Sequence, residues 1–86
     1  MPEISRFYGI IIAMFFEDHN PPHFHARYGG DKASISIEDL RVMEGSLPPR
    51  ALGLVMEWAA QHKTELMRSW QQAENNQQPD KIEPLK

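Results

Sequence analysis

The chain has no cysteine, no excess of positive charge and no apolar run long enough to cross a bilayer. The absence of cysteine excludes disulfides and thiolate metal ligands. The formal net charge of −3 argues against a protein held on nucleic acid mainly by counterion release. The most apolar stretch, residues 8–16, is too short to span a membrane, and it lacks the flanking features of a secretory signal. We therefore expect a cytoplasmic protein without membrane contact.

The length of the chain sets the number of domains. Eighty-six residues suffice for one domain with one hydrophobic core, and the sequence has no internal repeat. We expect residues 1–79 to form a single α+β domain. Residues 80–86 are expected to be a C-terminal tail that is either disordered or docked on the sheet through Ile82 and Leu85.

Alternation and turn residues predict three strands and a short fourth one. Residues 10–16 are a continuous run rich in isoleucine and phenylalanine, which is typical of a strand covered on both faces. Residues 23–28 and 32–38 alternate between polar and apolar, the period of a half-buried strand. Gly29-Gly30-Asp31 between them indicates a hairpin turn. A fourth strand is expected near residues 41–43.

The apolar period then changes to three and four, as on one face of a helix. The positions are Leu52, Val55, Ala59, His62, Leu66, Trp70 and Ala73. Pro48 and Pro49 suit a first helical turn, where the N–H groups are unpaired. The pattern predicts one long amphipathic helix over roughly residues 48–74. The expected fold is α+β: a three- to four-stranded antiparallel meander followed by this helix, packed on one sheet face.

The connection over residues 17–22 suggests a strand register in which Phe16 lies opposite His23 and Met14 opposite His25. One face of the sheet would then be uniformly apolar and covered by the helix, with Phe24, Ala26, Tyr28, Ile11, Ala13, Phe15, Ala33, Ile35 and Ile37. The other face would carry His23, His25, Arg27, Ser34 and Ser36 beside Ile10, Ile12, Met14 and Phe16.

In this arrangement the strand over residues 10–16 is an apolar edge of the sheet. A bare apolar edge favours aggregation. We therefore expect it to be covered by a second copy of the chain, by a partner protein or by the C-terminal tail.

Three of the four histidines, His19, His23 and His25, lie within seven positions around a double proline. One interpretation is structural: imidazoles beside such a turn bond to loop carbonyls and cap strand ends. His62 lies in the helical stripe, where a packed, hydrogen-bonded histidine is expected.

A second interpretation is a metal site. His23 and His25 are two apart on a strand, so both rings project from one face. His19 or Asp18 could complete the set from the loop. Histidine nitrogens and a carboxylate suit zinc or a similar divalent ion.

A third interpretation is general acid–base catalysis without a metal. His23 and His25 can supply an acid and a base near neutral pH, with His19 in support. Arg27 on the same face, and Arg50 at the helix start, are the candidates for binding a substrate phosphate. Such a set is the minimum for cleaving RNA through its own 2′-hydroxyl. For both arginines the alternative is an exposed, solvated side chain.

The chain resembles a small bacterial family catalogued as domain of unknown function 4160. The resemblance rests on FEDHNPPHFHARYG at residues 16–29, EGSLPPRAL at residues 44–52, and EWAAQH with the later Glu65-Leu66. The opening MPEIS and the closing KIEPL are also similar, so the resemblance covers essentially the whole chain.

The resemblance implies a partner. It implies pairing with a second small protein, from domain of unknown function 2442, in a type II toxin–antitoxin module. Our first hypothesis is therefore a toxin-like, metal-independent RNase that uses the histidine pair, with no cofactor. The alternatives are a non-enzymatic, antitoxin-like module that binds protein, RNA or DNA, and a divalent-metal-binding domain. A homo-oligomer is also expected from the exposed apolar strand.

Overall fold

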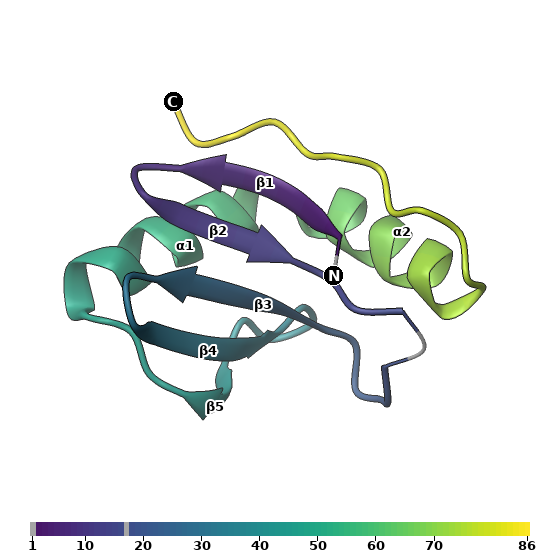
Figure 1. Cartoon of the computed structure of the whole chain (residues 1–86), viewed down its shortest axis with the longest axis horizontal. Coiled ribbons are helices and arrows are strands. Elements are labelled where there is room, and N and C mark those ends of the chain that lie inside the picture. Colours follow the sequence, from purple (N-terminus) through teal and green to yellow (C-terminus); the bar gives the residue numbers. More distant parts are fainter. Residues whose placement is uncertain (1, 17) are drawn as a thin grey trace.

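Five antiparallel strands form one meandering sheet in which each strand pairs with the next (Figure 1). They are β1 (Glu3–Phe7), β2 (Ile10–Ala13), β3 (His23–Tyr28), β4 (Asp31–Ser36) and β5 (Val42–Gly45). The computed structural model describes residues 2–16 and 18–86. Met1 and Glu17, which belong to the motifs quoted above, lie outside the described residues. The expected α+β class with an antiparallel sheet is confirmed.

The first strand, β1, was absent from the expectation of three or four strands. It pairs with β2 through a tight turn at Tyr8 and Gly9, whose φ angles are 50° and 80°. The register shifts between Glu3 and Ser5, so Ile4 is an extra residue in the strand. Such a bulge breaks the alternation of polar and apolar residues, and the sequence of β1 therefore does not have the period of a strand.

Two helices follow the sheet where one long helix was expected. Helix α1 covers Pro49–Gln61 and α2 covers Lys63–Glu74. The break is at His62, which has φ −130° and donates its N–H to the carbonyl of Ala59, three residues back. The apolar stripe continues across the break, so the sequence pattern alone reads as one helix.

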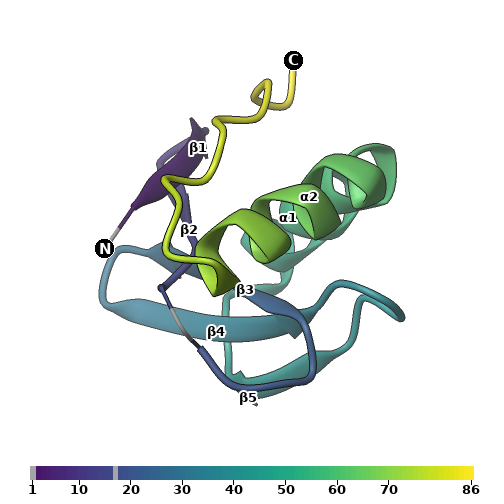
Figure 2. The ribbon, with the colours of Figure 1, turned by 90° about the vertical axis from the view of Figure 1, so that its right-hand side faces the viewer.

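Both helices lie on one face of the sheet (Figures 1 and 2), as expected. Trp58 of α1 is fully buried and its ring centroid lies 5.3 Å from that of Phe7 and 5.9 Å from that of Phe24. The core also contains buried side chains from β2, β4 and α2: Ile10, Ile12, Ala33, Ile35, Leu66, Trp70 and Ala73. Tyr28, expected in this core, is exposed.

The expected register between the first two strands is wrong by one residue. Ala13 lies opposite His25 and Ile11 opposite Arg27. A slip of one residue exchanges the two faces of a strand. The core face therefore carries Ile10, Ile12 and Met14, all fully buried, and Ile11, Ala13 and Phe15 lie beside His25 and Arg27. β2 ends at Ala13 and β3 begins at His23, so the connection is longer than the assumed residues 17–22, and a connection of this length does not fix which residues lie opposite each other.

The strand expected at the sheet edge is also an interior strand. β2 is covered by β1 of the same chain, which was not among the three expected covers. The segment after α2 runs along β1 (Figure 1), where Ile82 donates its N–H to the carbonyl of Ile4 and is itself buried. Trp58 donates its indole N–H to the carbonyl of Glu83. The C-terminal segment therefore joins β1 to the helices.

Within the described part of the chain, we find no helix with the length and apolarity needed to cross a membrane.

Candidate functional site

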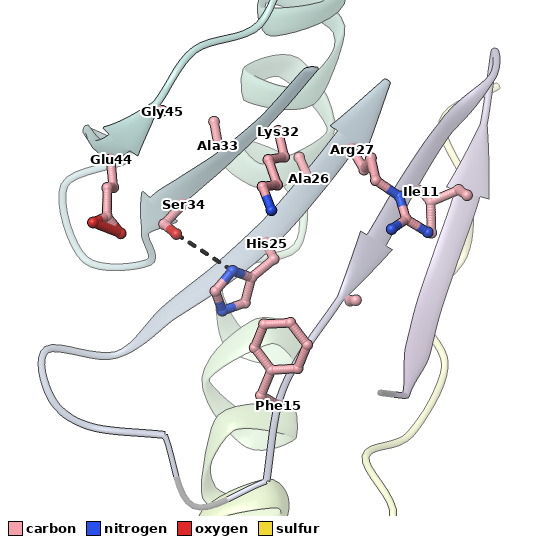
Figure 3. A pocket seen from close by; sticks show the side chains of 11 residues that line it. Ile11, Phe15, His25, Ala26, Arg27, Lys32, Ala33, Ser34, Glu44 and Gly45 are labelled. Carbon is pink, nitrogen blue, oxygen red and sulfur yellow. Dashed lines mark hydrogen bonds between the residues drawn. The ribbon is translucent and has the colours of Figure 1, made fainter. Parts of the chain in front are cut away.

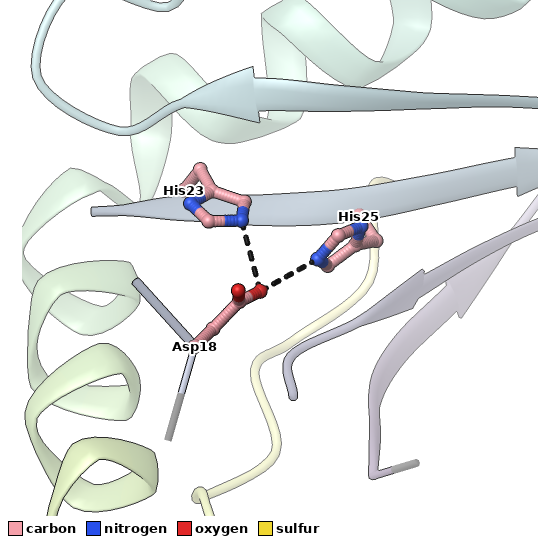
Figure 4. A group of neighbouring side chains, drawn as sticks. All are labelled: Asp18, His23 and His25. Carbon is pink, nitrogen blue, oxygen red and sulfur yellow. Dashed lines mark hydrogen bonds and ion pairs between the residues drawn. The ribbon is translucent and has the colours of Figure 1, made fainter. Parts of the chain in front are cut away.

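The loop between β2 and β3 returns Asp18 to the start of β3, where its carboxylate meets two histidines (Figure 4). Asp18 Oδ2 lies 2.9 Å from His23 Nε2 and 3.1 Å from His25 Nε2. One ligand atom from each of the three residues lies within 4.8 Å of the other two. Two imidazole nitrogens and a carboxylate oxygen therefore converge on one point.

His23 is held from its far side. It is buried, against the expectation of an outward-facing side chain, with its ring centroid 5.2 Å from that of Trp70 in α2. Its Nδ1 donates to the carbonyl of Pro21 at 2.7 Å. Because a carbonyl only accepts, Nδ1 carries the hydrogen, and a neutral ring then has a bare Nε2 that faces the Asp18 carboxylate. Two acceptor atoms that face each other at 2.9 Å repel, and a cation between them would remove this repulsion.

His25 is held in a similar way by β4. Its Nδ1 lies 3.3 Å from the Ser34 hydroxyl oxygen, and its ring centroid lies 4.1 Å from that of Phe15. Burial of the imidazole lowers the pKa of His25, more than the hydrogen bond to Asp18 raises it. Burial therefore favours the neutral ring, the form that binds metal.

The Asp18 carboxylate is held by hydrogen bonds. Burial of the Asp18 carboxyl acts to raise its pKa. The hydrogen bonds from His25 and from the His19 backbone N–H act in the opposite direction, as do the charges of His23 and His25. Together they keep the pKa of Asp18 below its ordinary value. The N–H of His19 donates to Asp18 Oδ1 at 2.9 Å, which fixes the carboxylate and leaves Oδ2 for the two imidazoles.

These three donors fit a divalent metal ion. Ligand atoms of a tetrahedral zinc site, each about 2.0–2.1 Å from the metal, lie about 3.3 Å apart, close to the 2.9 and 3.1 Å between Asp18 and the two histidines. In metal sites the second nitrogen of a ligating histidine usually bonds to a carbonyl or another polar group. Pro21 and Ser34 occupy these positions here. Three protein ligands would leave one tetrahedral position for water or a bound molecule.

The other two histidines, His19 and His62, lie outside the cluster of Asp18, His23 and His25. The His19 side chain is 91% exposed, with Nδ1 3.3 Å from Asp18 Oδ1, so it lies beside the outer oxygen of the carboxylate. His62 lies at the break between the helices, pairs with Glu65 and contacts the ring of Trp58. This position agrees with the structural role expected for His62.

A cavity of about 370 Å³ lies on the open face of the sheet, beside the three-residue cluster. Its lining includes Ile11, Ala13, Phe15, His25, Arg27, Lys32, Ser34 and Glu44. His25 and Lys32 lie at its centre, with Arg27 and Ile11 on one side and Ser34 and Glu44 on the other (Figure 3). His25 therefore belongs both to the cluster and to the cavity.

The two arginines predicted to bind substrate are in different places. Arg27 lines the cavity beside His25, whereas Arg50 lines a separate hollow with Tyr8 and Tyr28. Sequence reasoning missed Lys32, the register partner of Arg27. The sequence does contain a pattern that could have identified Lys32. A two-residue turn at Gly29-Gly30 places Tyr28 opposite Asp31, and therefore Arg27 opposite Lys32.

Comparison with known proteins gives one positive result. A family model described as "Domain of unknown function (DUF4160)" matches residues 9–71. This range contains the Asp18, His23 and His25 cluster and the cavity, but neither β1 nor the C-terminal segment. No curated protein and no solved structure matches the chain.

Proposed function

The chain belongs to the DUF4160 family, and we propose that it is a divalent-metal-binding protein whose ligands are Asp18, His23 and His25. The observation that carries the proposal is the convergence of two imidazole Nε2 atoms on one carboxylate oxygen, with both Nδ1 atoms engaged on the outside. Zn²⁺ is the first candidate, because it accepts nitrogen and oxygen ligands at this spacing.

The negative charge of the buried Asp18 carboxylate also supports a bound cation between Asp18, His23 and His25. Asp18 is only 14% exposed and His23 is 5% exposed. An ionised carboxylate removed from water needs a partner charge. A divalent cation held by Asp18, His23 and His25 would supply this charge.

The test is a calorimetric titration of untagged, metal-free protein with ZnCl₂. We expect one equivalent to bind, and we expect Asp18→Asn and His25→Gln each to weaken binding by about a hundredfold or more, since each removes a ligand. His62→Gln is the matched control, because it removes a histidine that also pairs with a carboxylate but lies outside the cluster. Thermal unfolding of each metal-free variant shows whether it still folds.

Two results would contradict the metal proposal. One is a wild-type protein that binds no zinc, and the other is a His25→Gln variant that binds it as tightly as the wild type. His19→Ala in the same series tests the exposed histidine. An unchanged zinc affinity would leave the ligand set at three residues, and a clear loss would add His19 as a fourth.

A second candidate is the RNA-cleaving toxin with a histidine acid–base pair. The observation that favours it is the hydrogen bond between Asp18 and His25 at the edge of a cavity that also contains Arg27. A carboxylate that orients a histidine is a common arrangement in acid–base catalysis. RNA cleavage that persists in EDTA and is lost in His25→Gln would favour this candidate over the metal site. Pairing with a protein of domain of unknown function 2442 stays a prediction.

A further inference from the structure

Two cationic side chains in the cavity have no anionic partner within residues 2–16 and 18–86. Arg27 and Lys32 lie directly opposite each other on β3 and β4, and both are exposed. Like charges on directly opposed residues of a sheet destabilise each other. An anion bound between them would remove this repulsion. The net charge of the protein is −3, so this pair is a local exception to the overall charge.

The rest of the cavity is apolar on the side of β2. Ile11 and Ala13 come from β2, and Phe15 follows it and contacts the ring of His25. Glu44 lies on the opposite side of the cavity from Arg27 (Figure 3). An anionic group is thus expected on the side of Arg27 and Lys32, with the uncharged part of the same molecule against Ile11 and Phe15.

We propose that this cavity binds a small phosphate ester. The inference rests on the proposed function, because His25 belongs to both the cavity and the proposed metal site, and a metal ion held there would add a third cationic contact to those of Arg27 and Lys32. A phosphate monoester has three terminal oxygens and a charge of about −1.5 to −2 near neutral pH, which matches these three cationic contacts better than a carboxylate does. The volume of about 370 Å³ is in the range of sites for small organic molecules.

The experiment measures the binding of phenyl phosphate by calorimetry to zinc-loaded protein dialysed free of excess metal. We expect Arg27→Gln and Lys32→Gln each to weaken binding about tenfold, as the loss of a hydrogen bond to a charged group predicts. The matched control is Arg68→Gln. It removes one positive charge from an exposed side chain on α2 that pairs with Asp80, and its affinity should equal that of the wild type.

Two further probes test the class of ligand. Inorganic phosphate should bind more weakly than phenyl phosphate, because it cannot use Ile11 and Phe15. Benzoate should also bind more weakly, because it offers two oxygens for three contacts. Equal affinity for either probe would overturn the assignment to a phosphate ester. A single-stranded RNA that binds more tightly than phenyl phosphate would overturn the restriction to small molecules.

The two proposals fail in different ways. If zinc binds but phenyl phosphate does not, or if Arg27→Gln and Arg68→Gln weaken binding equally, the phosphate-ester site is wrong and the metal site stands. If zinc does not bind, the metal proposal is wrong. The binding of phenyl phosphate is then measured with the metal-free protein. If that binding is not weakened in Arg27→Gln or Lys32→Gln, the phosphate-ester site is wrong as well.

Discussion

At the scale of single residues, the site depends on which nitrogen of each histidine faces inward. Pro21 and Ser34 engage the Nδ1 atoms of His23 and His25, and this fixes both Nε2 atoms toward Asp18. The residues that orient the rings come from the loop and from β4, so neither is recognisable as part of a metal motif. The three proposed ligands are already held in position in this structure, which would reduce the conformational entropy lost when a metal ion binds.

The lowered pKa of His25 predicts a pH dependence of stability in the metal-free protein. As the pH falls through the ordinary histidine range, from about 7.5 to about 5.5, the unfolded chain binds a proton at His25 before the folded chain does. The free energy of unfolding therefore decreases with falling pH. Urea unfolding in EDTA across this range measures the decrease, and His25→Gln should make it smaller.

The control for this measurement is Gly53→Ala, which changes no titratable group at an exposed position of α1 and should retain the wild-type pH dependence of the free energy of unfolding. The lowered pKa of Asp18 has the same sign but acts at lower pH, in the range where carboxylates titrate. A His25→Gln variant whose stability falls as steeply as that of the wild type would show that His25 is not the group responsible.

At the scale of elements, the turns and edge strands position the cavity. Gly45, at the end of β5, has a φ of 77°, a conformation that favours glycine. A Cβ at this position would overlap the carbonyl oxygen of Lys32 on the neighbouring strand. Gly53, in α1, is exposed and has open space around it.

These two glycines predict opposite effects of the same substitution. Gly45→Ala should lower the free energy of unfolding by about 2 kcal/mol or more, because it adds both strain and a clash. Gly53→Ala should raise it by about 0.5–1 kcal/mol, because alanine is a better helix former than glycine. Chemical denaturation of both variants tests the pair. A loss of stability in Gly53→Ala would contradict the helical environment described for it.

At the scale of the whole molecule, the two ends of the chain close the fold. β1 covers β2, and the C-terminal segment lies along β1 and reaches the helices through the Trp58–Glu83 and Ser69–Asp80 hydrogen bonds. Both ends lie outside the range matched by the family model. The molecule therefore depends on segments distant from the cluster for the burial of its core.

Ile82 is the buried anchor of the C-terminal segment. Ile82→Ala should lower the free energy of unfolding by about 2–4 kcal/mol, as for other large-to-small substitutions in a core. Lys81→Ala, at an exposed position of the same segment, should change it by less than about 0.5 kcal/mol. Equal stabilities of the two variants in urea unfolding would show that the segment is not docked. Zinc affinity should be similar in both folded variants.

The amino-acid sequence by itself determined the local features of this protein. The polar and apolar alternation of β3 and β4, the glycine turn between them and the apolar stripe of the helices are properties of neighbouring residues, and all three could be predicted. The nearness of His23 and His25 also follows from the sequence, because histidines two apart on a strand share a face, but the sequence left His19 and Asp18 as alternatives for the third ligand. The apolar stripe continues from α1 into α2 across the break at His62, so the break did not change which helical residues face the sheet.

Only the tertiary structure decided which residues meet. Strand register depends on how the connection between β2 and β3 closes in space, and an error of one residue in this register exchanged Ile11 and Ile12 between the core and the cavity. β1 was missed because a bulge at Ile4 hides its period. The convergence of Asp18 on His23 and His25, and the pairing of Arg27 with Lys32, depend on how a loop and two hairpins close in space. A local pattern does not specify such contacts, because they form between residues from different elements.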